Sequence, residues 1–123
     1  MKTWKPTWNA SKQPRKQRVY VYRAPLHVKR EFLASHLSKE LRAKHNKRSI
    51  PIRKGDKVKV MRGTHQGKTG KVERVDVKRT TIYITGIDVI KKDGSKTLLP
   101  FHPSKLLIQE LDLTDKRRVE MKK

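Results

Sequence analysis

Apolar side chains are distributed unevenly along this chain, and their distribution constrains the fold more than any other feature. They are sparse before Ile50, whereas from Ile52 to Leu111 they recur with the period of a β-strand. Such alternation places one face of a strand against a core and the other in solvent. Only 33% of the 123 residues are hydrophobic. The pattern therefore predicts one small core in the second half of the chain.

Several short strands are expected in this half, at Lys57–Val60, around Val72, Val75 and Val77, through Ile82–Ile84, on both sides of Asp93-Gly94, and at Leu106–Leu111. The step of three residues from Val72 to Val75 predicts a β-bulge. Asp93-Gly94 predicts a two-residue hairpin turn that joins Asp88–Lys92 to Ser95–Leu99. Five or six strands in about sixty residues, with glycine in the turns, favour a mainly β fold, a small antiparallel barrel.

The first half of the chain is expected to form an extension that builds no core of its own. Met1 to Arg18 combines high charge, two prolines and no periodicity, which is typical of an arm without structure. Two short helices are expected next, one from Pro25 to Leu33 and one capped by Ser38. The predicted organisation is a partly helical extension at residues 1–49, a barrel at 50–111 and a short charged tail at 112–123.

The charge balance indicates a polyanionic partner. The chain has 33 Lys and Arg residues and 11 Asp and Glu residues, a formal net charge of +22. Residues 1–55 carry +14 of this charge and residues 56–123 carry +8. Such a surface repels itself unless a polyanion offsets the charge. No apolar run approaches the ~18 residues that span a bilayer, so nucleic acid is favoured over a membrane.

Other classes of function find little support in the sequence. There is no Cys, and the five His residues lack the spacing of metal ligands, so no metal or other cofactor is expected. The segment from Gly63 to Thr69 ends in Gly-Lys-Thr, but Arg62 stands where a phosphate-binding loop needs glycine. No carboxylate pair or triad suggests an enzyme. The N-terminus lacks the apolar middle of a secretory signal, so a cytoplasmic location is expected.

The most specific segment runs from Ile52 to Val75. Gly55-Asp56 opens a strand, a loop holds Gly63, Gly67 and Gly70, and Val72 begins the return strand. The three glycines are expected to let the loop backbone approach a partner. This arrangement resembles the KOW motif of ribosomal proteins and transcription elongation factors. The flanks resemble the archaeal and eukaryotic form of the universal large-subunit ribosomal protein family numbered twenty-four, at Pro14–Arg18, Ala24–His27, Leu37–Arg42, Arg48–Asp56 and His102–Lys105.

The resemblance implies an SH3-like barrel seated on large-subunit rRNA near its 5′ end, close to the exit of the peptide tunnel. It also implies a structural role in the ribosome and in early subunit assembly. The expected partners are rRNA and neighbouring large-subunit ribosomal proteins, with no membrane and no small-molecule substrate. The alternative is a KOW-type transcription elongation or nucleic-acid-binding factor, which usually carries a further folded domain.

Basic residues of the extension and of the barrel loops are the expected phosphate contacts, which position a protein on RNA without reading its sequence. Trp4 and Trp8 have two interpretations, stacking on unpaired bases or anchoring in a crevice of a neighbouring protein. His102 is expected either to contact RNA or to pack within the fold. The expected RNA-binding residues are Trp4, Trp8, Arg15, Lys16, Arg18, Arg23, Lys29, Arg30, Arg42, Lys47, Arg48, Lys54, Arg62, Thr64, His65, Lys68, Lys71, Lys78, Arg79 and His102.

Overall fold

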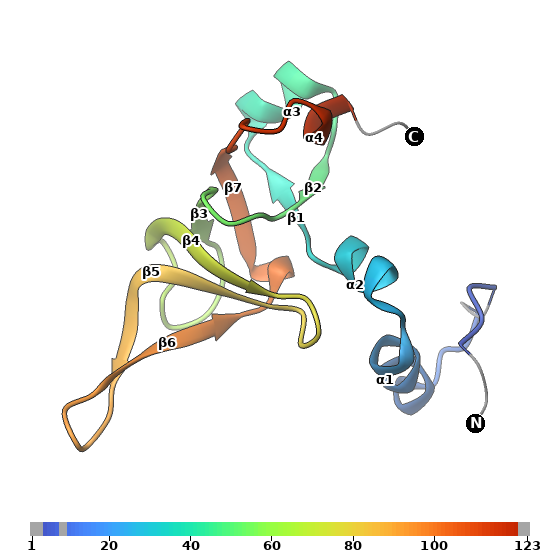
Figure 1. The fold of residues 1–123 in the computed structure, drawn as a ribbon, viewed down its shortest axis with the longest axis horizontal. Coiled ribbons are helices and arrows are strands. Elements are labelled where there is room, and N and C mark those ends of the chain that lie inside the picture. Colours follow the sequence, from blue (N-terminus) through green and yellow to red (C-terminus); the bar gives the residue numbers. More distant parts are fainter. Residues whose placement is uncertain (1–3, 8–9, 121–123) are drawn as a thin grey trace.

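The computed structural model describes residues 4–7 and 10–120, and its fold is mainly β, as predicted (Figure 1). The helices are α1 (Pro14–Arg23), α2 (Leu26–Phe32), α3 (Lys39–His45) and α4 (Arg117–Glu120), with a 3₁₀ turn η1 (Pro103–Lys105). The strands are β1 (Ala34–Leu37), β2 (Ser49–Pro51), β3 (Lys57–Val60), β4 (Thr69–Asp76), β5 (Thr81–Ile90), β6 (Lys96–Phe101) and β7 (Leu106–Glu110).

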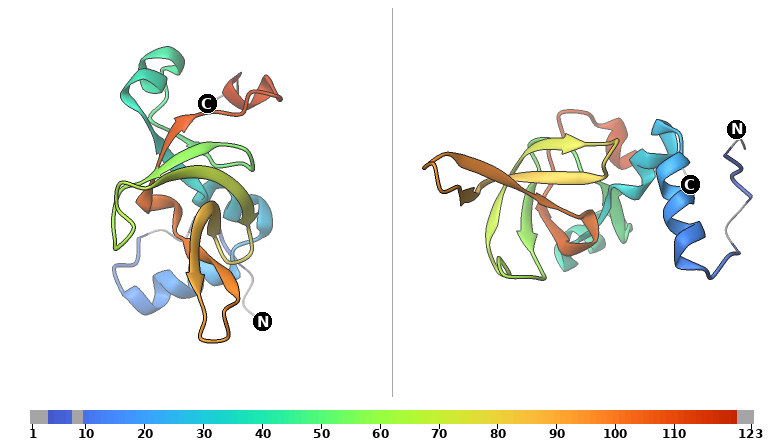
Figure 2. Two further views of the ribbon diagram at one scale, coloured as in Figure 1. Left: turned by 90° about the vertical axis from the view of Figure 1, so that its left-hand side faces the viewer. Right: turned by 90° about the horizontal axis from the view of Figure 1, so that it is seen from below.

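These strands form one curved sheet in the order β2-β1-β7-β3-β4-β5-β6 (Figure 2). β7 has β3 antiparallel on one side and β1 parallel on the other. The strands β3 to β7 pair antiparallel, as predicted for the barrel, and β1 of the extension adds a parallel pairing. No pairing between β2 and β6 closes the sheet within the described part of the chain, so the barrel is open.

One hydrophobic core joins all parts of the sheet. Leu37 of β1, Ile108 of β7 and Val58 of β3 lie beside one another in register, and each is fully buried. The same core includes Ile50 of β2 and Phe101 of β6, at the two ends of the strand order. The two edge strands of the open sheet are thus linked through side-chain packing rather than through backbone hydrogen bonds.

The local patterns of the second half are largely confirmed. The register shifts between Val72 and Arg74, where the bulge is predicted. The hairpin at Asp93-Gly94 forms, but its loop has three residues, because Lys91 N donates to Ser95 O (2.9 Å) and Gly94 N to Lys91 O (3.0 Å). A two-residue turn of the preferred type requires positive φ at both residues, and only Gly94 has it (+84°).

The first half contains more regular structure than its sequence pattern predicts. The expectation that the arm is unstructured is wrong from Pro14 onward, where α1 begins. Proline presets the helical φ of a first turn, and the Trp4 ring lies 5.2 Å from that of Tyr20 on this helix. β1 and β2 are also unforeseen, because strands of 4 and 3 residues carry too few positions to show alternation.

The two helices predicted after the arm are confirmed. Pro25 precedes the first residue of α2, and Ser38 Oγ accepts a hydrogen bond from Leu41 N (3.4 Å) at the start of α3. Capping of this kind satisfies a helix amide that has no partner within the helix. Asn46 ends α3 in the left-handed conformation (φ 51°).

Asp56 is a buried junction between segments that are distant in sequence. The carboxylate accepts hydrogen bonds from Arg53 N (2.9 Å), as expected for a turn, but also from Asp112 N (3.0 Å). Arg118, in the tail, donates to both carboxylate oxygens, and also to Asp112 O and Pro51 O at 3.0 Å each. Asp56 is 0% and Arg118 2% exposed. The tail is therefore part of the fold.

Replacing Arg118 with Leu should destabilise the protein by about 3–5 kcal/mol, because it leaves the Asp56 carboxylate buried without its counter-charge. Urea unfolding followed by circular dichroism measures the free energy of unfolding. Arg117→Leu is the matched control, since Arg117 is the exposed neighbour on the same helix. Equal stabilities of the two variants would show that the buried pair does not hold the tail.

Candidate nucleic-acid interface

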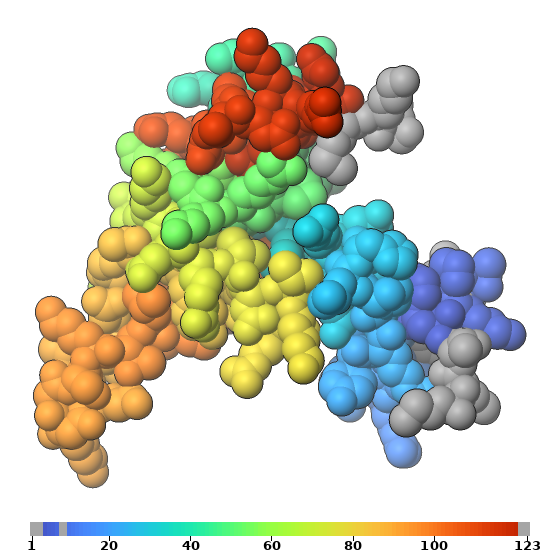
Figure 3. All heavy atoms as spheres, in the orientation of Figure 1, coloured from blue at the N-terminus to red at the C-terminus, as the bar shows by residue number. Residues whose placement is uncertain are grey.

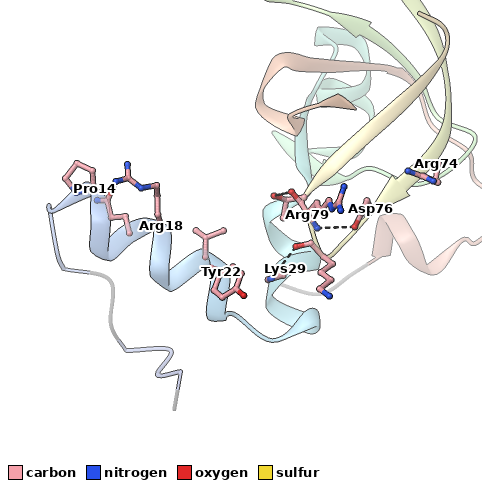
Figure 4. Close-up of a pocket in the computed structure, with 11 residues that line it drawn as sticks. Pro14, Arg18, Tyr22, Lys29, Arg74, Asp76 and Arg79 are labelled. Carbon is pink, nitrogen blue, oxygen red and sulfur yellow. Dashed lines mark hydrogen bonds between the residues drawn. The ribbon is translucent and has the colours of Figure 1, made fainter. Parts of the chain in front are cut away.

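A cleft of about 1200 Å³ lies between α1 and the turn that joins β4 to β5 (Figure 4). In the space-filling view the surface is indented between this turn (yellow) and the N-terminal helices (blue; Figure 3). The cleft is lined by Pro14, Gln17, Arg18, Val21, Tyr22, Lys29, Arg74, Asp76, Lys78, Arg79 and Thr80. We call it the α1–turn cleft.

The α1–turn cleft concentrates positive charge that the protein does not neutralise. Five of its lining residues are Lys or Arg and one is acidic. Within the described residues, the side chains of Arg18, Lys78 and Arg79 make no hydrogen bond and no ion pair. Like charges that line one cleft repel one another, so a bound anion would relieve the repulsion.

The β4–β5 turn has a fixed and unusual backbone. Asp76 Oδ1 accepts a hydrogen bond from Arg79 N (3.0 Å), and the Thr80 hydroxyl donates to Arg79 O (2.7 Å). Thr80 has φ +54°, a conformation that is costly for a β-branched residue. Strained residues of this kind often accompany functional sites. The turn thereby holds Lys78 and Arg79 at the rim of the cleft.

Lys29 differs from the other expected phosphate contacts because it is buried, with 7% of its surface exposed. Its Nζ donates to Lys78 O (3.3 Å) and lies 5.9 Å from the centre of the Tyr22 ring. Lys29 thus connects α2 to the β4–β5 turn beneath the cleft. Its burial argues for a positioning role rather than a direct phosphate contact.

A second group of expected residues surrounds the loop between β3 and β4. Arg62, Thr64, Lys68 and Lys71 are exposed there. The His65 ring meets Phe101 edge-on, with 6.2 Å between centres, and its Nδ1 lies 3.3 Å from Lys68 Nζ. The loop is therefore anchored on the core by His65, and its cations face solvent.

The three loop glycines have two different roles. Gly63 and Gly67 have φ of +97° and +85°, and an added Cβ would meet nothing within 4 Å, so their neighbourhood is open to a partner. Gly70 is expected to lie in the loop with the other two glycines, but it lies in β4. A Cβ there would stand 2.5 Å from Ile84 Cγ2 and 2.7 Å from Thr85 O. Gly70 allows two strands of the sheet to approach closely.

The remaining expected residues are spread over the surface. Arg15, Lys16, Arg23, Arg30, Arg48 and Lys54 are exposed. Arg42 Nε donates to Leu37 O (2.9 Å), and the Lys47 ammonium donates to Val119 O, so both also serve the fold.

Two aromatic residues and one histidine complete the expected set. Trp4 packs on Tyr20, a contact within the chain that neither interpretation anticipates. Trp8 lies outside the described residues. His102 Nδ1 accepts a hydrogen bond from Ser104 N (3.3 Å) and caps η1, and the residue is exposed.

The sequence missed Gln17, Tyr22 and Arg74 as lining residues of the α1–turn cleft. Tyr22 follows Arg18 by four positions, which on a helix places both on one face. That spacing would have identified Tyr22, had α1 been predicted.

Two classes of site are absent from the part of the chain that the structure describes. Across residues 4–7 and 10–120, no helix is both long and apolar enough to cross a membrane. Over the same ranges, no three His, Cys, Asp or Glu residues gather as a metal site would require.

The chain is similar to proteins of the large ribosomal subunit. A family model for eukaryotic ribosomal proteins L26 and the archaeal ribosomal proteins numbered twenty-four matches residues 11–122. The chain is 48% identical over 108 residues to the large ribosomal subunit protein uL24 of Methanosphaera stadtmanae, covering 88% of this chain and 92% of that protein. It is 49% identical over 117 residues to uL24 of Nanoarchaeum equitans, covering 95% of this chain and 79% of the relative.

Replacing Arg18, Lys78 and Arg79 together with Gln should weaken binding to single-stranded RNA and flatten its salt dependence. Each phosphate contact on a single strand contributes ~0.7 to the slope of log affinity against log salt, so the slope should fall by about 2. The matched control replaces Lys91, Lys92 and Lys96 on the β5–β6 hairpin with Gln, which removes the same charge. Equal slopes for both variants would mean that only net charge matters.

Proposed function

The chain belongs to the family of eukaryotic L26 and archaeal uL24 ribosomal proteins, and we propose that it is held in the ribosome by binding large-subunit rRNA through its basic surface. Family membership makes the chain a structural constituent of the large ribosomal subunit, in the cytoplasm, and not an enzyme. The proposal concerns how it attaches to RNA and what that attachment does.

The observation that carries the proposal is the α1–turn cleft, where three cations have no partner among the described residues. A protein that neutralises phosphates with such residues releases bound counterions, which favours binding. Further exposed cations lie on α1, on α2 and in the β3–β4 loop. Residues of the extension and of the β4–β5 turn therefore contribute to one binding site.

The position on the rRNA follows from the family resemblance of the sequence motifs. It supports a site near the 5′ end of the large-subunit rRNA and near the exit of the peptide tunnel, beside other ribosomal proteins. Because RNA is synthesised from its 5′ end, a protein bound there joins the particle early and supports its assembly. No observation favours a transcription elongation factor.

The full chain should bind a transcript of the 5′ portion of large-subunit rRNA more tightly than a 3′ transcript of equal length. Phosphate contacts are common to both transcripts, so a difference in affinity reports contacts that only the 5′ site provides. Filter binding over a series of salt concentrations measures both affinities. Equal affinities would reject the 5′ location. Absence of binding to either transcript would reject RNA binding altogether.

Depletion of the protein from growing cells should cause large-subunit precursors to accumulate as particles lighter than the complete subunit. Sucrose-gradient sedimentation of cell extracts measures this, and small subunits are the internal control. Restored expression of the intact chain should return the precursors to full-sized subunits. A normal subunit profile after complete depletion would contradict the role in assembly.

A further inference from the structure

The α1–turn cleft has an aromatic wall as well as a cationic one, and we propose that it receives an unpaired nucleotide of RNA. The base stacks on Tyr22 of α1, and phosphates of the same strand lie by the guanidinium groups of Arg18 and Arg79 on the two sides of the cleft. This inference rests on the proposed function, since it takes RNA as the ligand and specifies its form.

Tyr22 is the first element of the site. It is 81% exposed, the most of any large hydrophobic residue in the described chain. Lys29 Nζ lies 5.9 Å from the ring centre, within the range of a cation–π contact. Lys29 is itself buried and bonded to Lys78 O. The ring is therefore positioned on one side, while most of its surface remains free to stack.

The two arginines are the second element. Arg18 lies one helical turn before Tyr22 on α1, and Arg79 belongs to the turn across the cleft (Figure 4). Neither guanidinium has a partner within the described residues. A guanidinium donates to phosphate through two parallel hydrogen bonds, which favours arginine over lysine for this task. An aromatic face within a cleft that has a free guanidinium on each side matches the base and the backbone of an RNA strand.

The arrangement favours an unpaired nucleotide over a duplex. In A-form RNA the bases are stacked inside, and recognition uses the backbone and the 2′-hydroxyls. Nothing in such a duplex covers an exposed tyrosine ring. Unstacked bases in loops and bulges do offer a free face to aromatic side chains. The volume of about 1200 Å³ leaves room for one nucleotide and its neighbours in the strand.

An acidic segment of a neighbouring protein would also neutralise the cations. Such a segment would not account for Tyr22, because the face of an aromatic ring carries negative potential and does not attract a carboxylate. Five basic residues and one acidic residue line the cleft. This balance and the exposed ring together favour RNA. A protein occupant is an outcome that crosslinking can detect.

The first experiment uses the full chain with a single-stranded oligouridylate and with an RNA duplex of the same length. Tyr22→Leu should weaken binding to the single strand by between about 5-fold and about 140-fold, the range for one base stacked on an aromatic ring. Duplex binding should change by less than about twofold, because a duplex offers no base to this ring. Tyr22→Phe is the matched control and should bind like the unaltered protein.

The salt dependence separates stacking from charge. Tyr22→Leu should leave the slope of log affinity against log salt unchanged, because stacking releases no counterions, whereas Arg18→Gln and Arg79→Gln should each lower it by ~0.7. If Tyr22→Leu binds the single strand like the unaltered protein, the inference is overturned, although RNA binding stands. If the unaltered protein binds no RNA, the proposed function fails.

The second experiment irradiates purified large subunits with ultraviolet light and examines the tryptic peptide Val19–Arg23 by mass spectrometry. A nucleotide adduct on Tyr22 is the expected result. A crosslink of this peptide to another protein, or an unmodified peptide beside modified peptides from the rest of the chain, would overturn the inference.

Discussion

The buried pairing of Asp56 with Arg118 holds together parts of the chain that the core alone does not fix. Asp56 opens β3, its carboxylate receives Asp112 N just after β7, and Arg118 reaches Pro51 O at the end of β2. Removing two charges from water is costly, and removing one partner of such a pair leaves the other charge buried and unpaired. Here the carboxylate has backbone as well as guanidinium donors. The start of β3, the segment just after β7, and helix α4 are thereby joined into one unit.

On the remaining surface, by contrast, most of the described charged side chains form no ion pair. Most Lys and Arg side chains lack an acidic partner, since ion pairs within the described chain are confined to Arg53–Asp115, Lys57–Glu110 and the Asp56 pair. Hydrogen bonds from Arg53 hold the pKa of Asp115 below its usual value. Acidic residues thus join parts of the fold that are distant in sequence, and most cations stay unpaired within the described chain. A small core tolerates this repulsion best when a polyanion is bound.

Features that depend on neighbouring residues could be predicted from the sequence, and features that depend on distant ones could not. Alternation at Val58 and Val60, the step to Val75 and the Ser38 cap are local, and the structure has them all. β1 was missed because a strand of 4 residues is too short to show alternation, and its pairing with β7 joins residues about 70 positions apart. The role of Arg118 was missed because its partner Asp56 lies 62 residues away. The expected cations were named individually, but their convergence on one cleft required α1, which the proline-rich, charged arm concealed.

The central place of β7 also determines the order in which this protein folds during its own synthesis. β1 and β3 have β7 as a shared neighbour, so both expose a strand edge until residues 106–110 emerge. Pairings between segments far apart in sequence close slowly, and open edges invite wrong partners in the meantime. The cleft beside α1 likewise cannot form until residues 76–80 have been synthesised. β1 therefore cannot be joined to β3 before residues 106–110 emerge, which is later still.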